Sequence, residues 1–468
     1  MIGLWVGLGC TEPTPSDAGA VTTIASPWIE SPRAAEDRDP DPAHLHASLV
    51  AVHEDGVYTY LDAARDGLAA GPGPTLRARV GDTLTVDLLN AMDVPTTIHW
   101  HGLRVPNAMD GAGWMDAPLP PGERFTYTFP LTQPGTFWYH PHVDTERQVD
   151  GGLYGFLVVD DPAEPPAERD LLLAFDTPRE ADPDAAPMDH ARARRAVPDT
   201  ADTNAHGGGE HAGGGASGLR WTVNGRPDAR VSVRAGARVR ARILNASNLS
   251  YLDLRGPPMR LLADDQGLLG AAQVTERLLL APGDRAEVEW TPGAGGSFAL
   301  LAAPYTLAGG EALGEPVPAL VVDVTGDAAS GDALALPFQG TGPTPDPGRT
   351  DVRYVLSGDP HTNDWRINRE AWPDVTPTEV QTGREVVIEV RNLSPTRHPF
   401  HVHGHAFEVL SSDGVPPPTR TVVDTWDVGI RETARFLLRA DNPGEWMVHC
   451  HVLGHEAHGM MTLLRVAP

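Results

Sequence analysis

The sequence predicts an all-β protein built as three consecutive β-sandwich domains, and three observations lead to this prediction. The chain has 468 residues, which is about three domains at roughly 150 residues each. Its 49 glycines and 45 prolines are spread along the chain, a distribution typical of many short strands joined by turns. A weak internal repeat also occurs three times, which indicates three related units.

The repeat consists of a turn glycine, an alternating stretch and an asparagine nine residues after the glycine. Its three copies occupy residues 81–90, 236–245 and 383–392. Alternation with period two predicts a strand with one face on a core and the other in solvent. A second pattern follows in each unit, where Pro121–Arg124 matches Pro282–Arg285 and Arg431–Thr433. Three copies of such a strand-rich unit predict Greek-key sandwiches in a row.

Composition places the boundaries between the units. We predict a signal-like or lipoprotein-like remnant with a disordered lead at 1–40, a first domain at 41–165, a second at 166–335 and a third at 345–468. Within the second domain, a Gly- and Asp-rich stretch at about 179–218 is predicted to be a flexible insertion.

The charge of the chain excludes two classes of partner. The formal net charge is -27 and the isoelectric point is about 5.0. Nucleic acids and anionic membrane surfaces both need positive patches on the protein, so we expect neither as a partner. No apolar tract reaches the length of about 18 residues that a spanning helix needs.

The two cysteines, Cys10 and Cys450, lie in unrelated contexts and predict no disulfide framework. Cys10 ends a short apolar stretch and precedes a Pro-, Ser- and Asp-rich run, which resembles the end of a bacterial lipoprotein signal. No basic residue precedes it, and Gly7 stands three residues before it in place of leucine. A lipid anchor at Cys10 and an ordinary signal remnant or misplaced start both remain open. We expect an exported protein, periplasmic or in the outer envelope.

Twelve of the 19 histidines fall in four short clusters. The clusters occupy residues 99–103, 138–142, 398–405 and 449–460. A His-X-His pair on a strand turns both rings to the same face, because side chains alternate with period two. Imidazole binds copper and zinc alike, so one pair is weak evidence for copper. Four pairs at matched places in two repeats indicate a metal site much more strongly.

Alignment of the repeats shows where the pairs come from. His99 and His101 match His401 and His403, while His140 and His142 match His449 and His451. Eight imidazoles could therefore meet at an interface between the first and third units. The middle unit has Leu301 in place of a histidine, and Asp253 and Arg255 in place of the first pair. We predict that it is a spacer that provides no ligand.

The third unit alone can build a second kind of site. Pro141 stands in the first unit where Cys450 stands in the third. A thiolate from Cys450 with imidazoles from His398 and His455, and a long axial thioether from Met460, describes a blue electron-transfer copper. Zinc would also fit a Cys/His set, but zinc would not explain the eight histidines beside it.

These four motifs, in this order near the two ends of the chain, resemble the multicopper oxidase family of laccases, bilirubin oxidases and copper-resistance oxidases. The resemblance covers roughly residues 45–468. It implies three cupredoxin domains, a mononuclear type 1 copper and a trinuclear cluster of one type 2 and two type 3 coppers. It also implies one-electron oxidation of a reducing substrate coupled to four-electron reduction of dioxygen to water.

The resemblance assigns each ligand to one of the four copper ions by its position in the motifs. The type 1 copper takes His398, Cys450, His455 and Met460. The type 2 copper takes His99 and His401. One type 3 copper takes His101, His140 and His451, and the other takes His142, His403 and His449. Electrons would pass from Cys450 through the backbone to its neighbours His449 and His451.

Two carboxylates are candidates for proton supply, because reduction of dioxygen consumes protons. Asp110 follows the first histidine pair and Glu456 adjoins His455, where similar bacterial enzymes carry acidic residues near the cluster. A general acid/base role would suit both. The alternative is that they are ordinary solvated carboxylates.

The sequence leaves the electron donor open. Phenols and aromatic amines, as in laccases, compete with cuprous or ferrous ions, and a non-catalytic copper-binding scaffold is a third alternative. The full ligand set argues against the scaffold. Only nine methionines occur and none form a Met-rich segment, which favours a small-molecule donor docking near His455. We expect a monomer that binds this donor and dioxygen.

Overall fold

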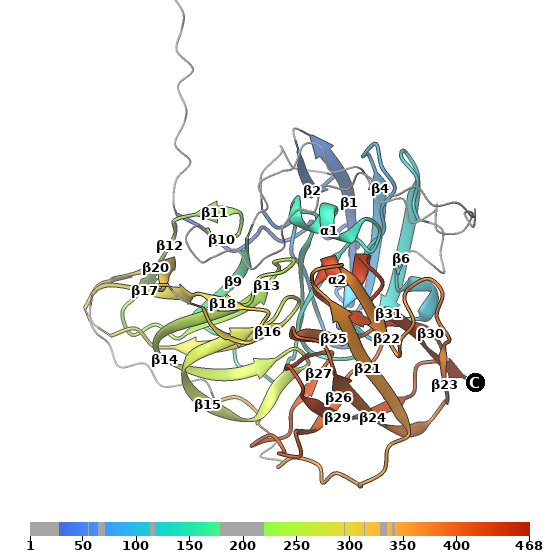
Figure 1. Cartoon of the computed structure of the whole chain (residues 1–468). Helices are drawn as coiled ribbons and strands as arrows, with labels where there is room; N and C mark the ends of the chain where they lie inside the picture. The colour runs from blue at the N-terminus through green and yellow to red at the C-terminus, as the bar shows by residue number, and fades with distance from the viewer. Residues whose placement is uncertain are drawn as a thin grey trace, which may run out of the picture.

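The computed structural model describes residues 28–54, 56–63, 71–112, 118–177, 220–293, 295–312, 314–327, 335–338 and 342–468. Cys10 and the insertion predicted at 179–218 lie outside these ranges. Helices within them are confined to α1 (Thr145–Asp150), α2 (Leu453–Ala457) and a single 3-10 turn, η1 (Asn107–Met109). None of these helices is long and apolar enough to cross a membrane. The remaining elements are strands, so the all-β prediction is confirmed (Figure 1).

Two four-stranded sheets enclose the core of the first unit. One sheet has the order β2-β1-β4-β6 and the other β3-β8-β7-β5. Their strands are β1 (His44–Glu54), β2 (Val57–Asp62), β3 (Leu76–Arg79), β4 (Thr83–Asn90), β5 (His99–His101), β6 (Arg124–Pro130), β7 (Gly135–His140) and β8 (Gly155–Asp160). The side chains of Val86, Trp100 and Phe137 are fully buried between the sheets.

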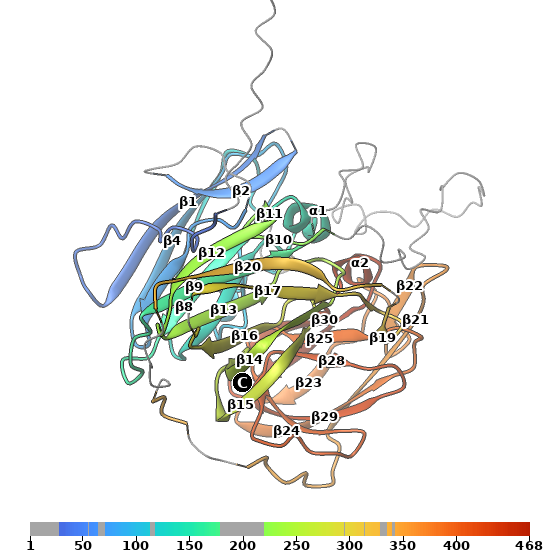
Figure 2. The same ribbon diagram turned by 90° about the vertical axis from the view of Figure 1, so that its left-hand side faces the viewer.

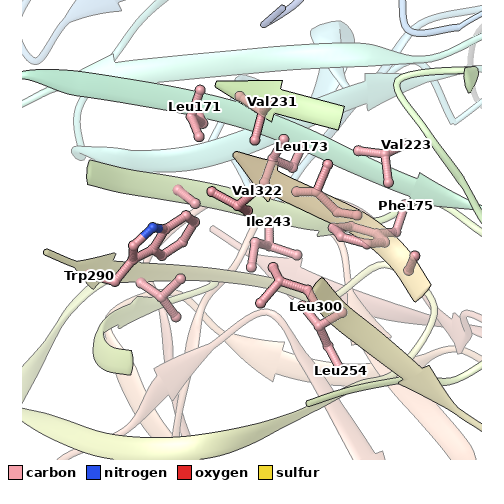
Figure 3. Packing of buried hydrophobic residues seen from close by; sticks show 14 of the residues in the cluster. Leu171, Leu173, Phe175, Val223, Val231, Ile243, Leu254, Trp290, Leu300 and Val322 are labelled. Atoms are coloured by element: carbon pink, nitrogen blue, oxygen red, sulfur yellow. The ribbon is translucent and has the colours of Figure 1, made fainter. Parts of the chain in front are cut away.

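The middle unit forms one continuous sheet around its core instead of two separate sheets. The order along the sheet is β11-β10-β9-β13-β16-β14-β17-β20-β12, with β15 paired to β14 and a small hairpin β18-β19 beside it. These strands are β9 (Arg169–Asp176), β10 (Thr222–Val223), β11 (Arg226–Pro227), β12 (Ala229–Arg234), β13 (Val239–Asn245), β14 (Leu252–Asp264), β15 (Gly267–Leu280), β16 (Arg285–Trp290), β17 (Gly296–Ala303), β18 (Tyr305–Thr306), β19 (Gly310–Glu311) and β20 (Val317–Thr325). Figure 3 shows side chains from several of these strands, among them Phe175, Ile243 and Val322, converging on one core.

The long strand β14 causes this continuity. Its first residues pair with β17, where Leu254 lies opposite Ala302, and its last residues pair with β16, where Leu261 lies opposite Val288. A register shift between Leu261 and Ala263 marks an irregularity in the strand. One strand therefore belongs to both halves of the sheet.

The third unit again has two sheets. The six-stranded sheet has the order β22-β21-β24-β29-β26-β27, and the five-stranded sheet β23-β31-β30-β25-β28. Their strands are β21 (Val352–Asp359), β22 (Asp364–Ile367), β23 (Thr378–Gln381), β24 (Arg384–Asn392), β25 (His398–Val402), β26 (Phe407–Ser412), β27 (Val422–Val423), β28 (Thr425–Val428), β29 (Thr433–Ala440), β30 (Gly444–Cys450) and β31 (Met461–Ala467). Both views place α1 of the first unit beside α2 of the third (Figures 1 and 2).

The repeated blocks of the sequence become β4, β13 and β24, and each ends at a fully buried asparagine. The side-chain amide of each asparagine donates to backbone carbonyls of the loop that follows: Asn90 to Val94, Asn245 to Ser250 and Asn392 to Thr396, at 2.9, 2.9 and 2.7 Å. A buried loop needs partners for its polar backbone groups, so the repeated asparagine fastens the chain where it leaves the strand. The domain boundaries given above stay predictions.

Candidate metal centre

Strand pairing places the histidine pairs of each end unit side by side. In the first unit β5 pairs with β7, so His99 lies opposite His140. In the third unit β25 pairs with β30, so His401 lies opposite His449. The two ladders face each other across the interface between the units. Rings from opposite units stack there: His101 on His401 with centroids 3.9 Å apart.

The eight paired histidines form three groups of three, with one ring shared between two groups. In each group the ligand atoms lie within 4.8 Å of one another, and every member is buried. The groups are His99, His101 and His401; His101, His140 and His451; and His142, His403 and His449. In the part of the chain that the structure describes, no such group contains a residue of the middle unit.

The hydrogen bonds of these rings leave one nitrogen of most of them without a partner. The Nδ1–H groups of His99, His140 and His401 donate to the backbone carbonyls of Asp110, Pro141 and Asp424, at 3.0, 2.8 and 2.9 Å. Their Nε2 atoms are buried and have no hydrogen-bond partner, and the same is true of Nε2 of His142. Buried polar atoms are nearly always satisfied. Orphaned ring nitrogens gathered in groups whose atoms lie within 4.8 Å of one another therefore fit metal ions.

Burial also keeps the rings neutral. Desolvation lowers the pKa of His449 to about 4, and it lowers the pKa of His101 and His401 well below the usual value, with further lowering from neighbouring histidines. A neutral imidazole has a lone pair free to bind a metal ion. The set of donors, all nitrogen, suits copper or zinc rather than calcium or magnesium.

The second candidate site lies in the third unit. The Sγ atom of Cys450 is 3.4 Å from Nδ1 of His398 and 3.6 Å from Nδ1 of His455, and the two Nδ1 atoms are 3.2 Å apart. The centre of this triangle lies about 2 Å from all three atoms, close to the length of a metal–imidazole bond. Burial raises the pKa of the Cys450 thiol, and a bound metal ion would deprotonate it.

Surrounding residues fix this triangle. The Nε2–H of His398 donates to Oγ of Ser394 at 2.6 Å, which turns Nδ1 toward the sulfur. The indole of Trp365 packs against His455 with ring centroids 3.8 Å apart and the ring planes tilted by 32°. Met460 is fully buried, and its backbone carbonyl accepts a hydrogen bond from the Cys450 N–H at 3.1 Å. The chain thus brings Met460 to the other three predicted ligands.

Both predicted proton carriers are buried beside the histidines. The Oδ2 atom of Asp110 accepts a hydrogen bond from Nδ1 of His403 at 2.8 Å. The carboxylate oxygens of Glu456 lie 3.7 Å from Nδ1 of His142 and 3.5 Å from Nδ1 of His449. Burial raises the pKa of Glu456 to about 8. Neither carboxylate is solvated, and both are in contact with predicted ligands.

Three contacts were not predicted from the sequence: Ser394 with His398, Trp365 with His455, and Asp424 with His101. The Nε2–H of His101 donates to Oδ1 of Asp424 at 3.0 Å, so this ring leaves Nδ1, and not Nε2, without a partner. No motif marks these residues, because they come from strands and loops outside the histidine clusters. Asp424 and Trp365 lack a neighbouring histidine in the sequence.

Comparison with known proteins identifies the class. Models of the multicopper oxidase family match residues 69–164 and 344–468. The multicopper oxidase MmcO of Mycobacterium tuberculosis is 33% identical over 429 residues, which cover 84% of this chain and 81% of that protein. Laccase-3 of Botryotinia fuckeliana is 27% identical over 463 residues, with 83% and 99% covered. A solved multi-copper oxidase from Pseudomonas thermotolerans superposes with a TM-score of 0.71 at 30% identity, over 91% of this chain and 99% of that one.

The chain belongs to the multicopper oxidase family. It is a copper-dependent oxidoreductase that couples one-electron oxidation of a small-molecule reducing substrate to the four-electron reduction of dioxygen to water. The predicted cupredoxin-like fold is confirmed by the same similarity to solved structures.

Proposed function

We propose that this oxidase holds about four copper ions per chain and is laccase-like, with phenols or aromatic amines as electron donors. One ion would be a type 1 copper bound by His398, Cys450, His455 and Met460. The orphaned ring nitrogens carry the rest of the proposal. His99 and His401 would hold a type 2 copper, and the triads His101, His140, His451 and His142, His403, His449 would each hold a type 3 copper.

When bound, copper would supply one-electron redox chemistry at the first site and the chemistry of dioxygen reduction at the second. The chain's own contribution is to join the two sites covalently. Cys450 stands between His449 and His451 at the end of β30. Each of these two predicted cluster ligands is therefore the immediate chain neighbour of the residue that carries the sulfur. An electron accepted at the surface therefore has a bonded path inward and need not cross solvent.

Asp110 and Glu456 are proposed to provide protons to the cluster. Asp110 touches His403, and Glu456 touches the two other members of the same triad. The two residues are only 3% and 6% exposed. The hydrogen bond of Asp110 to Nδ1 of His403 orients that ring, whereas Glu456 lies 3.7 and 3.5 Å from two other Nδ1 atoms without a hydrogen bond to them. A carboxyl this close to the cluster ligands could pass a proton to the site of dioxygen reduction by way of water. The alternative of ordinary surface carboxylates does not agree with their burial.

The donor is proposed to dock at the edge of His455, which is 5% exposed. The N–H of Leu453, in the same short helix α2, donates to the carbonyl of Asn248, and the next residue, Leu249, is 43% exposed. An exposed apolar side chain next to the residue that contacts α2 suits an aromatic ring better than a hydrated metal ion. The absence of a Met-rich segment from the sequence and the likeness to Laccase-3 support the same choice.

Experiments on the purified, copper-loaded protein test both the copper content and the class of electron donor. We expect an intense blue colour, about four coppers per chain, and loss of the blue band with most cluster copper retained in Cys450→Ser. A colourless wild type with full copper would contradict the type 1 assignment. Turnover of a phenolic dye precursor should exceed turnover of cuprous and ferrous ions measured side by side. The reverse order would make the protein a metallo-oxidase.

Export and a monomeric state are also proposed, on the apolar stretch before Cys10 and on the complete ligand set within one chain. Fractionation of cells that produce the full chain tests export, and a Cys10→Ala variant tests the lipid anchor. A shift of the protein from the membrane fraction to the soluble envelope fraction in this variant would support acylation at Cys10. Sedimentation of the holoenzyme measures the oligomeric state.

A further inference from the structure

The middle unit provides no member of the histidine groups found in the described residues, yet one of its turns lies against them. This turn, residues 281–285, connects β15 to β16. The N–H of Gly283 donates to the carbonyl of Asn245 at 2.9 Å, and the N–H of Gly122 donates to the carbonyl of Asn90 at 2.7 Å. The turn of the middle unit is therefore the structural counterpart of a turn in the first unit.

The two turns have the same backbone but different surroundings. Gly283 has a φ of 89° and Gly122 a φ of 82°. A Cβ atom on Gly122 would meet nothing within 4 Å, whereas a Cβ on Gly283 would lie 3.0 Å from Cγ and Nδ1 of His451. The third unit has Arg431 at this place with a φ of 64°. The backbone of the turn thus accepts a side chain where there is room, and the ring of His451 removes that room at Gly283.

Arg285, at the end of the turn, is linked through Asp424 to two more histidines. Its side chain is fully buried, and Nη1 and Nη2 donate to Oδ1 and Oδ2 of Asp424 at 2.9 and 2.6 Å. Oδ1 of Asp424 accepts from Nε2 of His101 at 3.0 Å, and its backbone carbonyl accepts from Nδ1 of His401 at 2.9 Å. The counterpart in the first unit, Arg124, is exposed. Asp424 thus orients one ring through its carboxylate and the other through its backbone carbonyl. Its buried carboxylate is held and neutralised from the middle unit.

We propose that the turn 281–285 is a positioning element for the cluster. Gly283 sets the place of the His451 ring, and Arg285 acts through Asp424 on His101 and His401. The unit without ligands thereby fixes ligands of both end units. This inference rests on the proposed roles of these histidines. Partners outside the ligand set that orient metal ligands typically contribute about 10- to 100-fold to metal affinity, so the effect is measurable.

Two pairs of variants isolate the two contacts. Gly283→Ala and Gly122→Ala carry the same backbone cost, because their φ values nearly coincide. Only the first pushes on a predicted ligand, and His451 must then give way by a few tenths of an ångström. Arg285→Lys keeps the positive charge but loses the paired hydrogen bonds to Asp424. Arg124→Lys makes the same change on the exposed turn.

The measurement is the rate at which purified holoenzyme loses copper to a chelator. Electron paramagnetic resonance follows the type 2 copper, and the blue band of the Cys450 site is an internal reference in the same molecule. We expect Gly283→Ala and Arg285→Lys to lose cluster copper about 10- to 100-fold faster, with an intact blue band. Arg285→Lys should also change the type 2 signal, because Asp424 bonds the predicted type 2 ligand His401. Both control variants should behave as the wild type does.

Three results would overturn the proposal: unchanged copper loss in both variants, an equal change in Gly122→Ala, or parallel loss of the blue band, which would indicate general destabilisation. The wild type separates this inference from the ligand assignment. If wild-type protein binds no cluster copper, the ligand assignment fails and the inference fails with it. If the wild type is normal and Gly283→Ala and Arg285→Lys are normal too, only the role of the turn is wrong.

Discussion

The backbone helps to position Met460, because its N–H donates to the carbonyl of His455 at 2.9 Å and its carbonyl accepts from the N–H of Cys450 at 3.1 Å. Its side chain is buried in the core of the third unit. A thioether is a weak, long axial ligand of blue copper. We therefore expect Met460→Leu to keep the blue site and to raise its reduction potential, measured by redox titration of the blue band. Complete loss of type 1 copper would contradict this, and Met461 would then need testing as the axial neighbour.

Asp110 and Glu456 touch the predicted cluster ligands, as Asp424 does, but only Asp424 is paired with a buried arginine, Arg285. If they supply protons, Asp110→Asn and Glu456→Gln should slow reoxidation of the reduced enzyme by dioxygen while reduction of the type 1 copper stays almost unchanged. A positioned acid contributes about 100- to 10,000-fold, so the loss is expected within that range. Stopped-flow spectroscopy measures the two half-reactions separately.

Glu123→Gln is a matched control for this prediction, since Glu123 lies on an exposed turn and the same charge is removed. It should leave both half-reactions unchanged. If the Asp110→Asn and Glu456→Gln variants were reduced more slowly by the donor but reoxidised normally, the two carboxylates would act in donor binding or oxidation instead. If neither half-reaction changed, Asp110 and Glu456 would have no role in the reaction.

The sequence predicted which histidines meet but not which nitrogen each presents. His-X-His spacing on strands and the matched repeats were enough to choose the residues. The orientation of His101 depends on Asp424, which is 323 residues away in the chain, and that of His398 depends on the Oγ of Ser394. Such pairings follow from the packing of one unit on another, and no local pattern encodes them.

At the level of elements, the repeated asparagine predicts a measurable stability difference. Asn392 donates to the carbonyls of Thr396 and Gly429 at 2.7 and 3.0 Å and accepts from the N–H of Ser394 at 2.9 Å. Asn392→Ala leaves these buried groups unsatisfied, so we expect a loss of about 2 to 3 kcal/mol in the free energy of unfolding. Chemical denaturation of the holoenzyme measures it.

Asn90→Ala is the comparison, because Asn90 fastens the equivalent loop of the first unit. Both variants should lose similar stability. Only Asn392→Ala should also change the type 1 spectrum, since Ser394 orients His398. A changed type 1 spectrum in both variants, or in neither, would contradict the link between this loop and the copper site.

The strands of the repeats were predictable because alternation and turn residues are local signals. The single sheet of the middle unit was not, because it depends on β14 pairing with β17 at one end and β16 at the other. Alternation tells which face of a strand is buried but not which strands lie beside it.

The spacer role predicted for the middle unit is likewise incomplete: it has no ligand in the groups formed by the described residues, but Gly283 and Arg285 lie against the cluster.

For the whole molecule, the cluster joins the two ends of the chain. Its predicted ligands lie on or directly after β5 and β7 of the first unit and β25 and β30 of the third. Direct contacts between these units also exist, as between Nδ2 of Asn107 and the carbonyl of Glu445 at 2.7 Å. Copper held by both units would add to these contacts, whereas copper held by Cys450, His398 and His455 lies within the third unit alone.

Removal of copper should therefore lower the unfolding temperature and weaken the coupling between the end units. A ligand bound only to the folded state, at 1,000 times its dissociation constant, stabilises that state by about 4 kcal/mol. Differential scanning calorimetry of the holoenzyme, the chelated protein and Cys450→Ser measures the effect. We expect a lower and broader transition for the chelated protein and a smaller decrease for Cys450→Ser, which keeps the cluster. An equal decrease in both would mean that the cluster adds nothing to the cohesion of the two units, since the loss of the copper within the third unit would then account for the whole change.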